Sequence, residues 1–144
     1  MNVYTIGFTK SSAEHFFSRL TGSGVSKVID VRLNNTSQLS AFAKSKDLEY
    51  FLRNLANIEY LHEPLLAPTK DILDEYKKFK GSWRTYEQKF LGLMETRKVD
   101  EKLNPDLLEN ACLLCSEDTP HYCHRRLVAE YLSDKWKNIE IIHL

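Results

Sequence analysis

The run Cys123-His124-Arg125-Arg126 carries the side chains of this sequence that are best suited to chemistry. It lies eight residues after Cys115, at the expected start of the last helix, where free N–H groups and partial positive charge favour anions. A cysteine beside arginines at such a place tends toward the thiolate, and arginines there can clamp a phosphate or carboxylate. The pattern predicts a reactive Cys123 in an anion-binding site with Arg125, Arg126 and Cys115. The alternative is a buried cysteine followed by two surface arginines.

Candidate acids and bases follow the ends of the predicted strands. Glu117 comes shortly after Cys115 and is the carboxylate best placed to donate or accept a proton. His62 and His124 carry imidazole rings, which titrate near neutral pH and suit the same work. The alternative for a lone histidine is a structural role.

Asp30 and Arg32 are two oppositely charged residues at the end of the strand predicted at 25–32. Asp30 and Arg32 are two residues apart, so both side chains point to one face of the sheet. We predict that Arg32 binds an anionic ligand, with Asp30 and Gly7 beside it at the same edge. The alternative is an ion pair of Arg32 with Asp30 or Glu117.

A metal site would have to combine Cys115 and Cys123 with one of the histidines, since zinc takes sulfur and nitrogen ligands. The chain has no Cys-x-x-Cys pair, and a spacing of eight is not that of a known zinc finger. We therefore predict no metal cofactor and keep a zinc site as the alternative.

Lysines and aromatic residues interleave between Lys70 and Tyr86, a composition that suits single-stranded nucleic acid. Tyr76 and Phe79, however, fall on the apolar face of the helix predicted there. A solvated lysine face over a packed helix is therefore the other interpretation of this stretch.

The elements that must position these side chains alternate along the chain. Short apolar runs predict five strands, at 3–6, 25–32, 58–61, 111–115 and 139–142. Apolar residues at helical spacing predict the helices between them, with Ser11, Asp47, Thr69 and Ser82 as caps.

Strands separated by helices predict one α/β domain over residues 1–144, with a mostly parallel five-stranded sheet and helices on both faces. Ligands bind beyond the carboxyl ends of the strands in such sheets. We therefore expect four loops to meet in space, at 7–11, 32–37, 62–68 and 115–124.

The amino-acid composition excludes several classes of protein. Of 144 residues 42% are hydrophobic, enough for a sizeable core, and 20 basic residues balance 20 acidic ones. Zero net charge argues against binding of nucleic acid or membranes by bulk charge. The absence of a long apolar run predicts no membrane partner, and three cysteines without an export signal predict a cytoplasmic protein with reduced thiols.

The chain resembles the bacterial and archaeal family called domain of unknown function 488. The resemblance rests on motifs that occur in the family's order over nearly the whole chain. They are Tyr4-Thr5-Ile6-Gly7-Phe8, Ile29-Asp30-Val31-Arg32, Tyr60-Leu61-His62, Leu113-Leu114-Cys115-Ser116-Glu117, Cys123-His124-Arg125-Arg126 and Ile142-His143-Leu144. The resemblance implies a compact α/β fold. Phe8 stands where the family often has histidine, so a histidine in the first turn has no role here.

We conclude from the sequence that the chain is an enzyme or a ligand-binding domain for a small anionic ligand, such as a nucleotide or a phosphorylated compound. Arg32, Arg125 and Arg126 would hold the ligand, and Cys123 would be a nucleophile or a polar contact. The alternatives are a nucleic-acid-associated protein, in line with the DNA-repair labels of some family members, and a non-catalytic protein with a structural metal.

Overall fold

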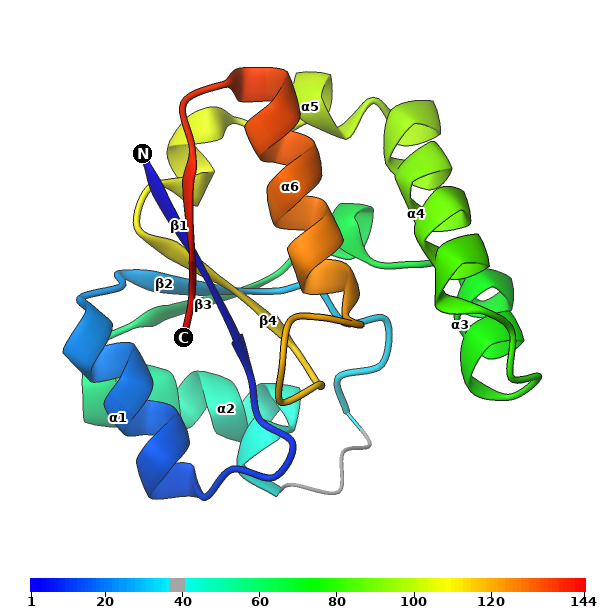
Figure 1. Ribbon diagram of the computed structural model, residues 1–144. Helices are drawn as coiled ribbons and strands as arrows, with labels where there is room; N and C mark the ends of the chain where they lie inside the picture. Colours follow the sequence, from blue (N-terminus) through cyan, green and yellow to red (C-terminus); the bar gives the residue numbers. More distant parts are fainter. Residues whose placement is uncertain (37–40) are drawn as a thin grey trace.

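The computed structural model describes residues 1–36 and 41–144 as a five-stranded sheet with helices on both faces (Figure 1). Every strand pairing among the described residues is parallel. The sheet has the order β3-β2-β4-β1-β5. Its strands are β1 (Asn2–Gly7), β2 (Lys27–Asp30), β3 (Glu59–His62), β4 (Ala111–Cys115) and β5 (Glu140–His143). The predicted α/β class and parallel five-stranded sheet are confirmed.

The helices run between the strands. They are α1 (Ala13–Ser23), α2 (Ser45–Phe51), α3 (Lys70–Lys77), α4 (Trp83–Arg97), α5 (Val99–Lys102) and α6 (His124–Trp136). Short helical turns add Ala41–Ala43, Leu52–Ala56, Pro64–Leu66 and Pro105–Leu108. None of the helices in the described ranges is long and apolar enough to cross a membrane.

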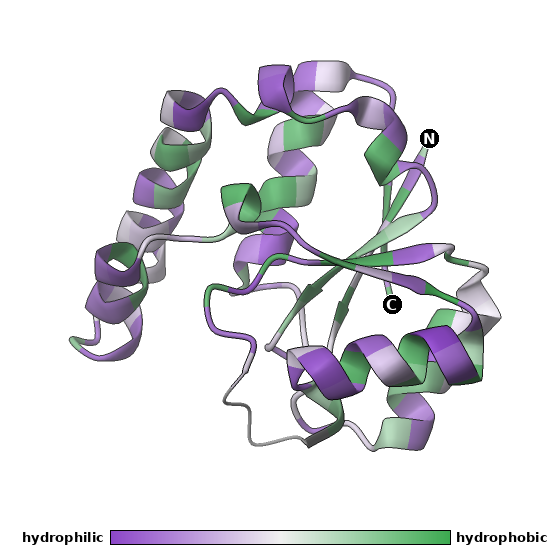
Figure 2. Cartoon of the chain, turned by 180° about the vertical axis from the view of Figure 1, so that it is seen from behind, coloured by the Kyte–Doolittle hydropathy of each residue, from purple (hydrophilic) through white to green (hydrophobic). Residues whose placement is uncertain are grey.

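Each face of the sheet packs into its own hydrophobic cluster. On one face α1 and α2 bury residues such as Phe16 and Leu48 against the sheet. On the other face α4, α5 and α6 do the same with Phe90 and Leu127. Figure 2 shows hydrophobic stretches along the strands, and hydrophobic and polar residues alternating along the helices. Alternate residues of one strand therefore belong to different cores.

The central strand β4 is buried at every residue, because both faces and both edges of it are covered. Its register places Cys115 opposite Gly7 of β1 and Leu114 opposite Asp30 of β2. Asp30 in turn pairs with His62 of β3. The carboxyl ends of these strands thus stand level at one edge of the sheet.

The helix starts agree with the sequence at two places and differ at two others. Thr69 and Ser82 cap α3 and α4, as predicted. The predicted cap at Ser11 is wrong by one residue, because the Ser12 hydroxyl accepts the hydrogen bond from the His15 N–H. The predicted cap at Asp47 is also wrong. It lies inside the first turn of α2, where its charge still suits the helix dipole.

Helix α3 is shorter than its apolar spacing predicts. It ends at Lys77, and Phe79 beyond it is 77% exposed rather than packed on an apolar face. The chain then turns at Lys80, which has a positive φ, and enters α4.

Candidate functional site

A pocket of about 210 Å³ opens at the carboxyl edge of the sheet. Five residues singled out in the sequence line it: Arg32, Cys115, Glu117, Cys123 and His124. The other lining residues come from the segment after β2, from α3 and α4, and from the loops around β4 and α6. They are Leu33, Asn34, Pro68, Leu73, Tyr76, Lys77, Trp83, Tyr86, Ser116 and Tyr122.

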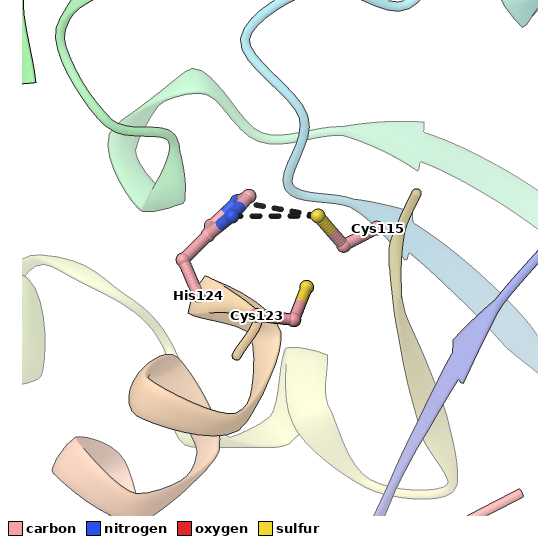
Figure 3. A group of neighbouring side chains, drawn as sticks. All are labelled: Cys115, Cys123 and His124. Atoms are coloured by element: carbon pink, nitrogen blue, oxygen red, sulfur yellow. Dashed lines mark hydrogen bonds between the residues drawn. The ribbon is translucent and has the colours of Figure 1, made fainter. Parts of the chain in front are cut away.

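Cys115, Cys123 and His124 form a compact group that we call the thiol cluster (Figure 3). Cys115 ends β4, Cys123 is the N-cap residue of α6, and His124 is the first residue of that helix. One ligand atom from each lies within 4.8 Å of the other two, and all three side chains are buried. The sequence could not show that Cys115 and Cys123 are neighbours. A cluster of this composition could hold a metal ion.

The His124 ring is fixed by two contacts on opposite sides. Its Nε2 lies 2.7 Å from the carbonyl oxygen of Val31. A carbonyl can only accept, so Nε2 carries a proton and donates it. Its Nδ1 lies 3.3 Å from Cys115 Sγ. The ring of Phe90 packs against the imidazole at 5.4 Å between centroids and limits its rotation.

The two thiols of the cluster have opposite pKa shifts. Burial raises the pKa of Cys115 well above its usual value, and the hydrogen bond to Cys123 raises it further. Burial also acts against the Cys123 thiolate, but the neighbouring Cys115 and His124 side chains and the charge of Arg125 outweigh the effect of burial. The pKa of Cys123 is therefore well below its usual value.

Arg125 lies behind the cluster and is completely buried. Its Nη1 donates to the carbonyl oxygen of Glu117 at 2.6 Å, and its Nε donates to the Thr5 hydroxyl at 3.4 Å. Both acceptors are neutral, and Nη2 has no hydrogen-bond partner among residues 1–36 and 41–144. The buried charge therefore acts on the thiol cluster, while the side chain supports the loop after β4.

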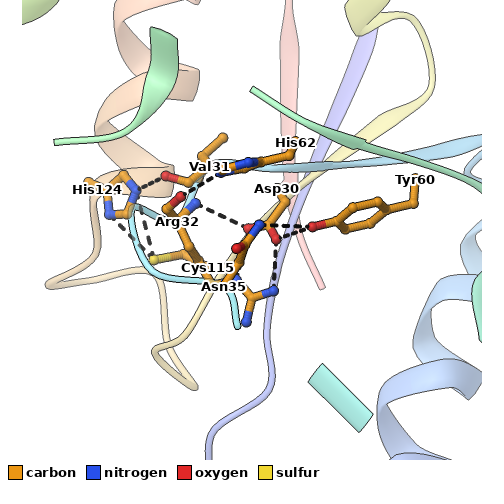
Figure 4. A network of polar contacts seen from close by, with 8 residues as sticks. All are labelled: Asp30, Val31, Arg32, Asn35, Tyr60, His62, Cys115 and His124. Atoms are coloured by element: carbon orange, nitrogen blue, oxygen red, sulfur yellow. Dashed lines mark hydrogen bonds and ion pairs between the residues drawn. The ribbon is translucent and has the colours of Figure 1, made fainter. Parts of the chain in front are cut away.

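Asp30, Arg32 and Tyr60 form a second polar group, the aspartate network (Figure 4). Arg32 donates to the Asp30 carboxylate through Nε at 2.8 Å and through Nη2 at 2.7 Å. The Tyr60 hydroxyl donates to the same carboxylate at 2.5 Å and accepts from Asn35. Burial and the bond to Asp30 raise the pKa of Tyr60. The ion pair that the sequence left as an alternative for Arg32 is present.

The Arg32 guanidinium also stacks over the Phe8 ring, with 5.2 Å from Cζ to the ring centroid. Its Nη1 has no hydrogen-bond partner in the described part of the chain. Phe8 is the residue that stands where the family often has histidine, and here it packs beneath a cation.

Lys77 and Glu117 form an ion pair at the mouth of the pocket, 2.6 Å from Nζ to Oε1. Partial burial acts to lower the pKa of Lys77, but the Glu117 carboxylate outweighs this effect, so the pKa is raised. Both side chains are partly exposed, 48% for Lys77 and 38% for Glu117, and water screens the pair. The carboxylate that the sequence offered as an acid or base is therefore at the entrance, held by a lysine.

Five candidate residues lie outside the pocket lining, and two of them, His62 and Arg126, belong neither to the groups above nor to the support of the site. His62 is exposed, and its Nε2 contacts the Arg32 carbonyl oxygen at 3.0 Å. Arg126 points away along α6 and forms an ion pair with Glu130 at 3.0 Å. Their position on a helix or strand could be predicted, but the direction of their side chains depends on the packing around them.

Gly7 supports the site without lining it. A Cβ at this position would lie 1.5 Å from the Glu117 carbonyl oxygen. Only glycine lets the end of β1 approach the loop after β4 so closely. The predicted contact of Gly7 with the site is thus one of backbone packing.

Four aromatic side chains line the pocket and form what we call the aromatic wall: Tyr76, Trp83, Tyr86 and Tyr122. Trp83 stacks on Tyr86 with centroids 5.0 Å apart and an angle of 20°, and contacts Tyr122 at 5.5 Å. Burial raises the pKa of Tyr86. The sequence interpretation assigned three of these rings to a helix face and missed Tyr122. The sequence feature that could have identified Tyr122 as a site residue is its position directly before Cys123.

Three lysines of the same stretch, Lys70, Lys77 and Lys78, are paired with carboxylates. Lys70 bonds to Asp74 at 2.6 Å, and Lys78 lies 3.9 Å from the same carboxylate. Lys80 and Arg84 form no ion pair with the described residues. With Lys77 bound to Glu117, much of the positive charge that could meet a nucleic acid is neutralised locally.

Comparison with known protein families matches residues 12–132 to the family described as "Domain of unknown function DUF488". No curated protein and no solved structure matched the chain. The matched segment contains the thiol cluster, the aspartate network and the aromatic wall.

Proposed function

The chain belongs to the DUF488 family, and we propose that it is an enzyme or a ligand-binding domain that takes a small nucleotide-like or phosphorylated ligand in the pocket at the carboxyl edge of its sheet. The observation that carries this proposal is that one pocket is lined both by an aromatic wall and by the first residues of α6, whose N-cap side chain makes no hydrogen bond to the helix. Each part suits a different half of such a ligand.

The aromatic wall suits a planar ring. Trp83 offers a π-face that every nucleobase can stack on, and Tyr76 and Tyr122 lie beside it with centroids 5.5 Å away. Tyr86 is buried, with the rings of Trp83 and Phe90 stacked against it, and supports this surface from behind. Stacking on such residues is worth about 1–3 kcal/mol for each base. A ligand without a flat ring would leave this wall unused.

The start of α6 suits an anionic group. The helix has 13 residues, and the side chain of its N-cap residue, Cys123, makes no hydrogen bond to the first turn. The first N–H groups and the positive end of the helix dipole are therefore available to a phosphate or carboxylate. Lys77 and Arg32 also line the pocket, but each is paired with a carboxylate, so the helix start carries the attraction for the anionic group.

The size of the pocket limits the ligand. A volume of about 210 Å³ lies below the roughly 300–1,000 Å³ that is usual for drug-sized ligands. We therefore propose a mononucleotide or a smaller compound rather than a dinucleotide.

For a catalysed reaction, the groups within reach of the bound ligand are Cys123 as a nucleophile or polar contact and His124 or Glu117 as a proton carrier. Arg125 supports this arrangement from behind. His62 and Arg126 have no part in it, since neither lines the pocket.

The test is calorimetry with AMP, adenosine, ribose 5-phosphate and inorganic phosphate. We expect AMP to bind more tightly than each of its parts, because it engages both the wall and the helix start. Trp83→Ala should weaken AMP binding about tenfold or more. Trp136→Phe is the matched control, since Trp136 bonds to Asp100 away from the pocket. No detectable binding of any of the four compounds would sink the proposal.

Nucleic-acid binding is the competing function, and salt dependence separates the two. Phosphate contacts along a strand make the affinity fall steeply with salt. A single-stranded oligonucleotide that binds more tightly than AMP, with a steep salt dependence, would favour the competing function.

A further inference from the structure

The donor atoms of the thiol cluster are arranged as a metal site with one open position. We propose that Cys115, Cys123 and His124 bind a Zn²⁺ ion whose fourth coordination position faces the pocket. This inference goes beyond the proposed function, because it concerns a metal that the chain would bind with or without a small ligand. With the ion bound, Cys123 and His124 are ligands, and Glu117 is the proposed proton carrier that remains.

The distances suit zinc. Bond lengths of about 2.3 Å to sulfur and about 2.0 Å to nitrogen place the ligand atoms of a tetrahedral site roughly 3.5–3.8 Å apart. Cys115 Sγ and His124 Nδ1 are already 3.3 Å apart, and all three donor atoms lie within 4.8 Å of one another. Small shifts of the side chains would complete the geometry.

The histidine is oriented as a ligand. Its Nε2–H is occupied by the Val31 carbonyl oxygen at 2.7 Å, so the lone pair is on Nδ1, which faces Cys115. Metal-binding histidines commonly donate their other ring N–H to a carbonyl or carboxylate in this way. The bond fixes both the tautomer and the direction of the ring.

The cluster is held by rigid elements. Cys115 belongs to the fully buried central strand, and the other two ligands begin a helix of 13 residues. Phe90 packs on the imidazole ring at 5.4 Å. Sites built on strands and helices keep their geometry better than sites on loops.

The fourth position is open toward the pocket. All three donors line that pocket, and within the described ranges the group contains no fourth histidine, cysteine, aspartate or glutamate. Glu117, the carboxylate in the same lining, is bound to Lys77 at the mouth. Structural zinc sites have four protein ligands, whereas catalytic sites have three and leave a position for water or substrate. The site is therefore of the open kind.

The donor set selects the metal. Two sulfurs and an imidazole suit Zn²⁺, whereas Mg²⁺ and Ca²⁺ need oxygen ligands. Two thiolates also balance the charge of the ion. An anionic group of a ligand in the pocket could then occupy the open position.

The experiment uses the full chain after treatment with a chelator under reducing conditions. Zn²⁺ is titrated against a colorimetric competitor, and Co²⁺ is added separately as a spectroscopic probe. We expect about one ion per chain, with the sulfur-to-cobalt charge transfer and intense visible bands of a tetrahedral site. Cys115→Ala, Cys123→Ala and His124→Ala should each weaken Zn²⁺ binding about 100-fold or more.

Cys112→Ala is the matched control, since Cys112 is equally buried but packs in the opposite core. Circular dichroism shows whether each variant is folded, and Cys123→Ser replaces Cys123→Ala if the latter is not. Zn²⁺ binding that none of the three substitutions weakens would overturn the proposal, as would a cobalt spectrum without sulfur charge transfer.

The same measurements separate this proposal from the proposed function. Trp83→Ala should weaken AMP binding and leave Zn²⁺ binding unchanged, because the ring is not a ligand. If the chain does not bind Zn²⁺, the proposal of AMP binding is unaffected. If it does not bind AMP, the zinc proposal is unaffected.

Discussion

Two polar groups stand side by side at the carboxyl edge of the sheet, one after β2 and one after β4, and they differ in how completely their members satisfy one another. In the aspartate network, the Asp30 carboxylate receives hydrogen bonds from Arg32 and Tyr60. In the thiol cluster, two sulfurs and one ring nitrogen converge on a pocket. The Val31 carbonyl, between Asp30 and Arg32 in the chain, orients His124 of the cluster.

The difference indicates two separate roles. Opposite charges that satisfy each other inside a protein hold the fold, because removal of one leaves the other unpaired. Donor atoms that face a pocket add little to the fold but can bind something from outside. A loss of stability is therefore expected from changes in the network, and a loss of binding from changes in the cluster.

The largest effect should come from Asp30→Ala. It leaves the Arg32 guanidinium, which is 2% exposed, without its partner, and should lower the free energy of unfolding by about 3–5 kcal/mol. Urea denaturation measures the change, with exposed Asp106→Ala as the control, which should change stability by less than about 0.5 kcal/mol. A loss below about 1 kcal/mol would contradict a structural role for the network.

Zn²⁺ should stabilise the wild-type chain against unfolding, but not a variant in which a residue of the thiol cluster is replaced. With Zn²⁺ at about 100 times its dissociation constant, the free energy of unfolding should rise by about 2.7 kcal/mol in the wild type. Thermal denaturation with and without the ion measures this gain. Cys123→Ala should lose it and Cys112→Ala should keep it. An equal gain in both variants would indicate metal bound elsewhere.

Tyr60→Phe removes one hydrogen bond to the Asp30 carboxylate and keeps the ring. Because the acceptor is charged and buried, the loss of stability should be about 1.5–3 kcal/mol. Tyr50→Phe is the control in the same denaturation experiment. Tyr50 is 61% exposed, so this substitution should change the free energy of unfolding by close to zero. Unaltered zinc binding by Tyr60→Phe would sharpen the separation of the two groups.

Gly7→Ala tests the support beneath the thiol cluster. The new Cβ would overlap the Glu117 carbonyl oxygen, so the backbone must shift at a cost of about 1–3 kcal/mol. Gly92→Ala, in the middle of α4 with open space around it, should instead stabilise the chain by about 0.5–1 kcal/mol. Equal effects of the two substitutions in denaturation would show that the close approach at Gly7 has no energetic weight.

The smallest effect should come from the mouth of the pocket. Lys77→Ala breaks a partly exposed ion pair, so stability should fall by only about 0.2–1 kcal/mol. The same substitution should weaken AMP binding, because it removes positive charge from the lining. Raising the salt concentration should reduce both effects, and effects that are insensitive to salt would argue for packing instead.

Most of the fold follows from local sequence signals. The run 111–115 predicts a buried central strand because it is apolar at every residue, and it is one. The caps at Thr69 and Ser82 were predictable because one hydroxyl and one nearby N–H decide a helix start. At Ser11-Ser12 two adjacent hydroxyls compete, and the packing of the loop selects the second.

The candidate site was only partly predictable. Its position at the carboxyl edge and the place of Cys123 and His124 at a helix start follow from the alternation of strands and helices. The aromatic wall did not, because three of its rings come from α3 and α4, which meet the Tyr122 loop after β4 only in the folded protein. The pairing of Arg32 with Asp30 was one of two alternatives that the spacing left open.

The class of fold, the order of elements and the residue types at the strand ends can be predicted from the sequence, since these depend on local periodicity and on neighbours in the chain. The tertiary structure decided that Cys115 meets Cys123 and that Val31 orients His124. The crossover from β3 to β4 inserts β4 between β2 and β1, and no local pattern encodes which strands become neighbours. The contacts that give the site its chemistry are therefore long-range contacts, fixed by how the whole sheet packs.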